Sequence, residues 1–196
     1  MRTFFFFFGV LATVLLGWVA LVGVPDAMIS EIQPPEGLRR YTAEELFGRS
    51  IYIREGCLYC HSQQVRPEGF GSDQDRFWGR PSVPGDYVFD KPHLLGTMRT
   101  GPDLLNIAVR QPSEQWHLIH LYNPRLVSPG SIMPPYPWLF EEKLSAGPND
   151  VVLALPDSLA PMGKVVVATR EGTALLRYLL SLDRSYPVAQ GVIRGK

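Results

Sequence analysis

The only two cysteines of the chain, Cys57 and Cys60, are separated by two residues and followed at once by His61. C-x-x-C-H is the attachment signature of a c-type haem, in which two thiols bond to the porphyrin and the adjacent imidazole ligates the iron. A thioredoxin-like dithiol would need a strand-to-helix context, a zinc site would need further ligands, and a disulfide would close a very small loop. The pattern therefore predicts one covalent haem c, with Cys57 and Cys60 binding the cofactor and His61 binding its metal.

A haem iron has a second axial position, and several downstream residues are candidates for it. The candidates are Met98, Met133, Met162, His93, His117 and His120. Met133 lies in "SIMPPYPW", where the neighbouring prolines fix φ and can hold a thioether in place without regular structure. His117 and His120 are spaced i, i+3 on one helix face, which we interpret as a polar or interface face. The sequence favours Met133 as the second metal ligand.

A short helix should position the cysteines. Thr42 and Glu45 form a capping box, and Phe47 and Ile51 share one face of the helix that follows. We expect this helix to end near Gly56, so that the cysteines lie just past its end.

The C-terminal part predicts a second helix, capped by Thr169 and ended by Pro187. Its apolar face consists of Leu175, Tyr178, Leu179 and Leu182. A short helix is expected in "PSEQWHLIHLY", and the β-branched runs at 151–155 and 165–167 could pair as a small hairpin. The remaining segments, rich in proline and glycine, are expected to be long loops.

The N-terminal segment Phe4–Val24 runs for 21 residues without a charge. As a helix it would span roughly 30 Å, the thickness of the hydrocarbon layer of a membrane. A cleaved signal peptide is the alternative, but Pro25 before Ala27 makes a poor cleavage site. The expected organisation is a transmembrane anchor at 1–25, a linker at 26–41, a cytochrome c domain at 42–186 and a C-terminal tail at 187–196.

Charge and chemistry limit the partners and the location. Lysine plus arginine equals aspartate plus glutamate at 19 each, so no basic field is present to bind nucleic acid. We expect the anchor to lie in a lipid bilayer. Because bacteria attach haem covalently outside the cytoplasm, we expect a single-pass protein of the bacterial inner membrane with its haem domain on the periplasmic side.

Three segments carry a family resemblance: "YIREGCLYCHSQQVRP", "GPDLLNIAVRQPSEQWHLIHLYNPR" and "SIMPPYPW". Over residues 42–140 they resemble the monohaem cytochrome c subunit of cbb3-type cytochrome c oxidases. The resemblance implies a mainly α chain, with one transmembrane helix and a class I cytochrome c domain. It also implies that His61 and Met133 are the axial ligands, and that the Pro102 carbonyl accepts a hydrogen bond from the other ring nitrogen of His61.

The function implied by this resemblance is electron relay from a donor cytochrome c to a polytopic catalytic haem-copper oxidase subunit, which reduces oxygen. No catalytic residue is expected in this chain. The small cytochrome c subunit of nitric oxide reductases is similar, and a membrane-tethered electron shuttle is a further alternative. The chain departs from the family at Met98, where a lysine is usual, and by an insert at 141–167.

Arginines and tryptophans near these segments are candidates to bind the haem propionates. They are Arg66, Arg110, Arg125, Trp78, Trp116 and Trp138. Most are expected to be ordinary surface arginines or core tryptophans. We take Arg110 and Trp116 as the predicted cofactor contacts.

Overall fold

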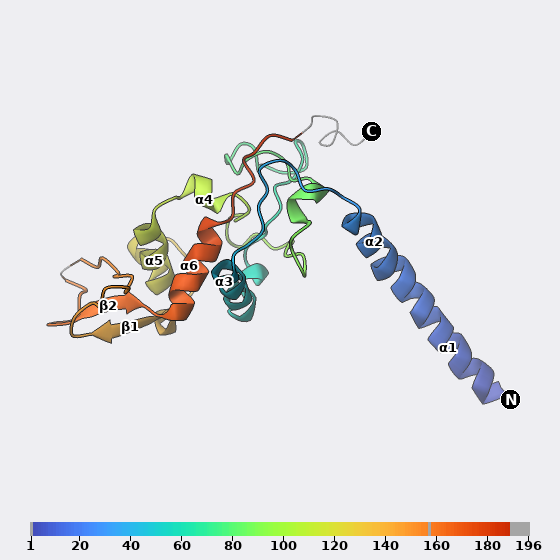
Figure 1. Cartoon of the computed structure of the whole chain (residues 1–196), viewed down its shortest axis with the longest axis horizontal. Helices are drawn as coiled ribbons and strands as arrows, with labels where there is room; N and C mark the ends of the chain where they lie inside the picture. Colours follow the sequence, from blue (N-terminus) through green and yellow to red (C-terminus); the bar gives the residue numbers. More distant parts are fainter. Residues whose placement is uncertain (1, 157, 189–196) are drawn as a thin grey trace.

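The computed structural model describes residues 2–156 and 158–188, so most of the expected tail at 187–196 lies outside the described residues. Helices dominate these residues, and the sheet has two strands (Figure 1). The fold class expected from the sequence, a mainly α chain with one N-terminal apolar helix and long loops, is confirmed.

The N-terminal helical segments form a rod that stands clear of the globular part (Figure 1). They are α1 (Arg2–Trp18), a π-helical turn (Val19–Gly23) and α2 (Val24–Ser30). The span Thr3–Met28 is long and apolar enough to cross a membrane. Helical structure continues beyond residue 25 because the Val24 N–H donates to the Val19 carbonyl, five residues back, and this wider turn accommodates Pro25.

Two helices pack against each other at the centre of the globular part: α3 (Ala43–Arg54) and α6 (Arg170–Leu180). The predicted capping box at Thr42 is confirmed. At the contact, a Cβ on Gly48 would collide with the carbonyl oxygen of Ala174. Glycine therefore lets the two helix backbones approach closely.

The prediction that Pro187 ends the C-terminal helix was wrong, because α6 ends at Leu180. The chain beyond α6 is hydrogen-bonded to the segment at residues 106–108. The Ala108 N–H donates to the Leu182 carbonyl, and the Arg184 N–H donates to the Asn106 side chain. Because these backbone groups form hydrogen bonds outside the helix, the helix ends before Pro187.

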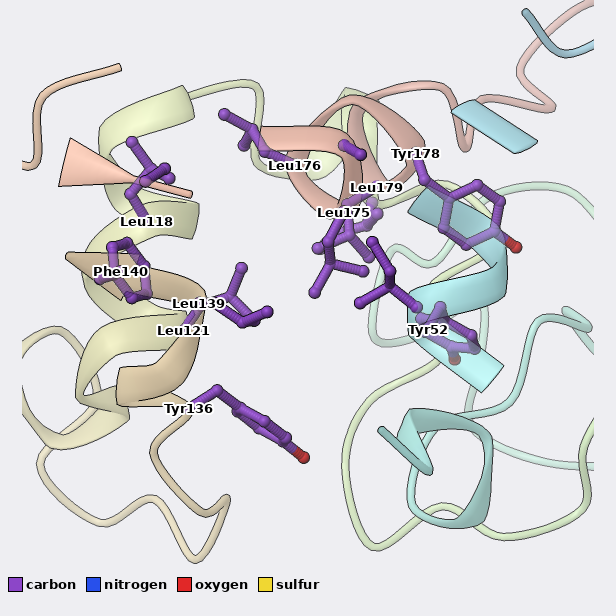
Figure 2. Packing of buried hydrophobic residues seen from close by; sticks show 14 of the residues in the cluster. Tyr52, Leu118, Leu121, Tyr136, Leu139, Phe140, Leu175, Leu176, Tyr178 and Leu179 are labelled. Carbon is purple, nitrogen blue, oxygen red and sulfur yellow. The ribbon is translucent and has the colours of Figure 1, made fainter. Parts of the chain in front are cut away.

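The core lies between α3 and α6 on one side and α5 (Glu114–Tyr122) on the other. Figure 2 shows Leu118 and Leu121 of α5, with Leu139 and Phe140, facing side chains of α6 such as Leu175. The short helix α4 (Ile107–Arg110) precedes α5. Single 3₁₀ turns lie at Cys57–Tyr59, Pro84–Tyr87, Pro124–Leu126 and Pro137–Leu139.

The sheet pairs β1 (Phe140–Lys143) with β2 (Val165–Ala168) in antiparallel register. The expected pairing of 151–155 with 165–167 is present in part, because Val152 forms an antiparallel bridge to Val167, but the main partner of β2 is β1. β1 reads FEEK, and two adjacent glutamates are poor strand formers. The strand forms because Phe140 is buried in the core and fixes the register of the exposed glutamates.

Candidate functional site

The C-x-x-C-H segment forms a tight turn at the end of α3. Gly56 adopts a left-handed conformation with φ of 75°, which reverses the chain after the helix. The N–H groups of Cys60 and His61 then both donate to the Cys57 carbonyl, at 3.2 and 3.0 Å. This turn brings the two cysteines to the same region, with Cys57 half-buried and Cys60 exposed.

The environment of Cys57 does not suit dithiol chemistry. Burial raises the pKa of the Cys57 thiol to about 12. A thiol that stays protonated is a poor nucleophile, whereas thiol oxidoreductases lower the pKa of their attacking cysteine. The sequence context and this pKa both disfavour a thioredoxin-like role.

His61 is held in one orientation by the segment that follows Met98. Its Nδ1 donates to the carbonyl of Pro102 at 2.7 Å, so Nε2 carries the lone pair. A Cβ on Gly101 would lie 2.7 Å from Nδ1 and 2.8 Å from Nε2, closer than real Cβ atoms approach. Burial lowers the pKa of His61, and the hydrogen bond to Pro102 opposes this effect. The neutral, oriented imidazole offers Nε2 to a metal.

Asp103 hydrogen-bonds to the segment that directly follows His61 and to the backbone of its own segment. Its carboxylate is fully buried and accepts from the Ser62 hydroxyl at 2.6 Å, from the Gln64 N–H at 2.7 Å and from the Leu105 N–H at 2.9 Å. The position of this residue at the site was not predicted from the sequence. The local signal was an aspartate after proline, which often accepts from the N–H two residues on.

A cluster of cations surrounds Trp78. The guanidinium groups of Arg99, Arg76 and Arg110 lie 5.1, 5.2 and 5.9 Å from the centre of its indole ring. Arg110 donates to the Asp103 carbonyl, but its Nε is buried and has no hydrogen-bond partner among the described residues. Burial lowers the pKa of Arg110, yet a guanidinium stays charged in proteins. An anion at this position would satisfy the group.

Met133 is the downstream methionine that packs against the core. Its segment is tied to α5 by a 2.9 Å hydrogen bond from the Tyr136 N–H to the Leu121 carbonyl. Met133 contacts the same core cluster as Cys57. The alternatives Met98 and Met162 are 56% and 98% exposed. Burial favours Met133 over these two as a metal ligand.

The other sequence candidates lie in different surroundings. Trp116 stacks on His120 in α5, with ring centres 4.5 Å apart. Trp138 is exposed and donates its indole N–H to Glu55 at 3.1 Å. Arg66 donates to the Thr97 carbonyl, and Arg125 is exposed in a 3₁₀ turn. Of the six candidates for the propionates, only Arg110 has a buried side-chain nitrogen without a hydrogen-bond partner among the described residues, which an anion would supply.

The family described as cytochrome C oxidase, mono-heme subunit/FixO matches residues 1–154 of the chain. The chain belongs to the FixO family. No curated protein matches it. The match begins with the apolar helix, includes the C-x-x-C-H turn and the Met133 segment, and ends within the insert predicted at 141–167. A FixO chain is a mono-haem subunit of a cytochrome oxidase complex, so a catalytic oxidase subunit is its partner.

The residues of this FixO chain fit a haem. The orphaned Nε of Arg110 suits a propionate, and the imidazole of His61 presents a free Nε2 beside a glycine that leaves room for its ring. A zinc site has no comparable support, since residues 2–156 and 158–188 contain no group of three or more His, Cys, Asp or Glu that could hold a metal ion.

Proposed function

We propose that this FixO chain binds one haem c covalently through Cys57 and Cys60, with His61 and Met133 as axial ligands. In this role the subunit takes single electrons from a donor cytochrome c and passes them to the catalytic subunit, which reduces oxygen. The observation that carries the proposal is the 2.7 Å hydrogen bond from His61 Nδ1 to Pro102, beside the two cysteines of a C-x-x-C-H turn.

When bound, the haem supplies one-electron transfer between ferric and ferrous iron. Pro102 fixes the tautomer and the plane of the His61 ring. The segment bonded to α5 holds the thioether of Met133 in a half-buried position. Arg110 would neutralise a propionate, and Trp116 would line the cofactor site from α5. Because hydrogen bonds hold His61 and the Met133 segment, electron transfer would require little rearrangement of these residues, which would favour fast transfer.

The proposed location follows from the helix and the cofactor. The span Thr3–Met28 would cross the bacterial inner membrane once, in contact with the lipid bilayer. The haem domain would lie on the periplasmic side, where covalent attachment takes place. In this arrangement residues 26–41 connect the anchor to a cytochrome c domain at 42–186.

The covalent attachment is tested with a Cys60→Ser variant of the full chain. We expect a changed pyridine haemochrome spectrum, because one thioether is lost, and weaker haem staining after denaturing electrophoresis. The control is Tyr59→Phe, which alters the same turn and leaves both thiols in place. A Cys60→Ser variant with normal covalent haem would refute the attachment.

The second ligand is tested by replacing methionines. Met133→Ala should remove the band from sulfur to ferric iron at the red edge of the visible spectrum, whereas Met98→Ala at an exposed position should keep it. Persistence of the band in Met133→Ala would exclude this residue as the ligand.

The assembly is tested by extraction in mild detergent. A subunit should copurify with a large polytopic protein that carries the catalytic centre. A chain that leaves the membrane alone would indicate a tethered electron shuttle.

A further inference from the structure

Arg49 of α3 and Asp90 form a buried ion pair whose facing atoms are too far apart for a hydrogen bond. Their side chains are 6% and 4% exposed, and Nε of Arg49 lies 3.9 Å from Oδ1 of Asp90. A hydrogen bond would need about 3.2 Å or less. Neither atom has a hydrogen-bond partner among the described residues. Because buried polar atoms in folded proteins almost always have a partner, a further group is needed between the two side chains.

Both side chains are held where they are by other bonds. The two terminal nitrogens of Arg49 donate to the carbonyls of Lys91, at 3.2 Å, and Pro92. The backbone N–H of Asp90 donates to the Tyr87 carbonyl at 2.8 Å. Lys91 directly follows Asp90, so a shift of the carboxylate toward Arg49 would also disturb the carbonyls that hold the guanidinium. The gap between Nε and Oδ1 is therefore fixed by the surrounding bonds.

The chemistry of the two atoms selects the group that fits between them. Nε–H of Arg49 can only donate a hydrogen bond, and a carboxylate oxygen of Asp90 can only accept one. The carboxylate would repel an anion, and the guanidinium would repel a cation. Burial raises the pKa of Asp90 and the charge of Arg49 opposes this rise. Water suits either protonation state of the carboxyl group, because it is both a donor and an acceptor.

We propose that a single buried water molecule bridges Arg49 and Asp90. It accepts from Nε–H and donates to Oδ1, since a water oxygen about 2.9 Å from each atom spans such a gap. Buried waters commonly satisfy polar groups in this way and are costly to remove. The bridge ties Asp90 to α3, the helix that leads into the C-x-x-C-H turn. Neither residue is among those proposed to bind the haem, so this site goes beyond the proposed function.

The test is nuclear magnetic resonance of the full chain in detergent, with haem bound and reduced. A long-lived bridging water should give a cross-peak between the water resonance and the Nε–H proton of Arg49. In the rotating frame, a dipolar contact and proton exchange give cross-peaks of opposite sign, so the two are distinguished. The matched control is Arg80, whose Nε donates to the Tyr186 carbonyl at 3.1 Å and whose guanidinium lies 2.7 Å from Asp86. We expect no dipolar cross-peak from water to Nε–H of Arg80.

A double variant, Arg49→Met with Asp90→Leu, removes both polar atoms. It should fold, because apolar replacement of both partners leaves no buried charge unpaired. A high-resolution structure of the wild type should show density about 2.9 Å from both Nε and Oδ1. The structure of the double variant should lack this density.

Three results would overturn the proposal: a wild type without the dipolar cross-peak at Arg49, a wild-type structure in which Nε and Oδ1 touch directly, and a double variant that keeps the density. The first two need only the wild type, so they hold even if the double variant does not fold. Failure of the proposed function would be seen separately, as a chain without covalent haem, and would leave the water signal unchanged.

Discussion

Replacing Gly101 with alanine tests how closely the backbone supports His61. The added Cβ would lie 2.7 Å from Nδ1 and 2.8 Å from Nε2 of the imidazole, so either the ring or the segment must move. Overpacking of this kind costs about 1–3 kcal/mol. Loss of the hydrogen bond to Pro102 adds about 0.5–1.5 kcal/mol. We therefore expect Gly101→Ala to lower the free energy of unfolding by roughly 2–4 kcal/mol.

The assay is thermal unfolding of the full chain in detergent, followed by circular dichroism and by the haem absorbance. A loss of about 2 kcal/mol lowers Tm by roughly 4–8 °C for a chain of this size. Gly130→Ala is the control, because a Cβ there meets no atom within 4 Å. If Gly101→Ala melts within 1 °C of the wild type with an unchanged spectrum, the close approach of Gly101 to His61 is refuted.

Three further predictions concern packing, charge and the buried carboxylate. Gly48→Ala should destabilise the fold by about 2 kcal/mol, because the collision with the Ala174 carbonyl outweighs the better helix propensity of alanine. Asp103→Asn should cost about 1–3 kcal/mol, since an amide cannot accept from all three donors. The hydrogen bond from Arg39 lowers the pKa of Glu45 below 4.5, so its contribution is present above about pH 4.5 and lost as the pH falls through the lowered pKa. Glu45→Gln should remove that part of the pH dependence and keep the cap.

Denaturant unfolding measures all three. Gly130→Ala, Asp75→Asn and Glu36→Gln are the matched controls, at sites that are open or exposed. Equal midpoints for Gly48→Ala and Gly130→Ala would contradict the close helix packing. An Asp103→Asn variant as stable as Asp75→Asn would contradict the role of the carboxylate. If the Glu45→Gln variant loses as much stability between pH 7 and pH 3 as the wild type does, the contribution of the Glu45 charge is contradicted.

The sequence predicts the parts of this chain that depend on neighbouring residues. The capping box at Thr42, the helix before the cysteines and the helix that carries Trp116 all follow from local spacing. The C-x-x-C-H signature depends on chemistry within five residues. These features were predictable because each is specified within one or two helical turns.

Features that join distant segments were not predictable in the same way. β1 forms because Phe140 is buried in the core, although its two glutamates disfavour a strand. The nitrogens of Arg110 and His120 that lack a partner among the described residues can be recognised only in the folded chain. The sequence shows which side chains can form hydrogen bonds, but only the packing of the folded chain shows which of them lack a partner among the described residues.

The candidate ligand His61 is positioned by two loops rather than by a helix or a sheet. The Gly101 N–H donates to the Cys60 carbonyl at 2.9 Å, and the Leu104 N–H donates to the Ser62 carbonyl at 2.8 Å. These bonds flank the hydrogen bond from His61 to Pro102, so the ring is fixed by backbone on both sides. Because these are hydrogen bonds between backbone groups, they place few requirements on the side chains of the two loops. Gly101 must leave room for the ring, and long loops can therefore fix the orientation of the His61 imidazole without a helix or a sheet.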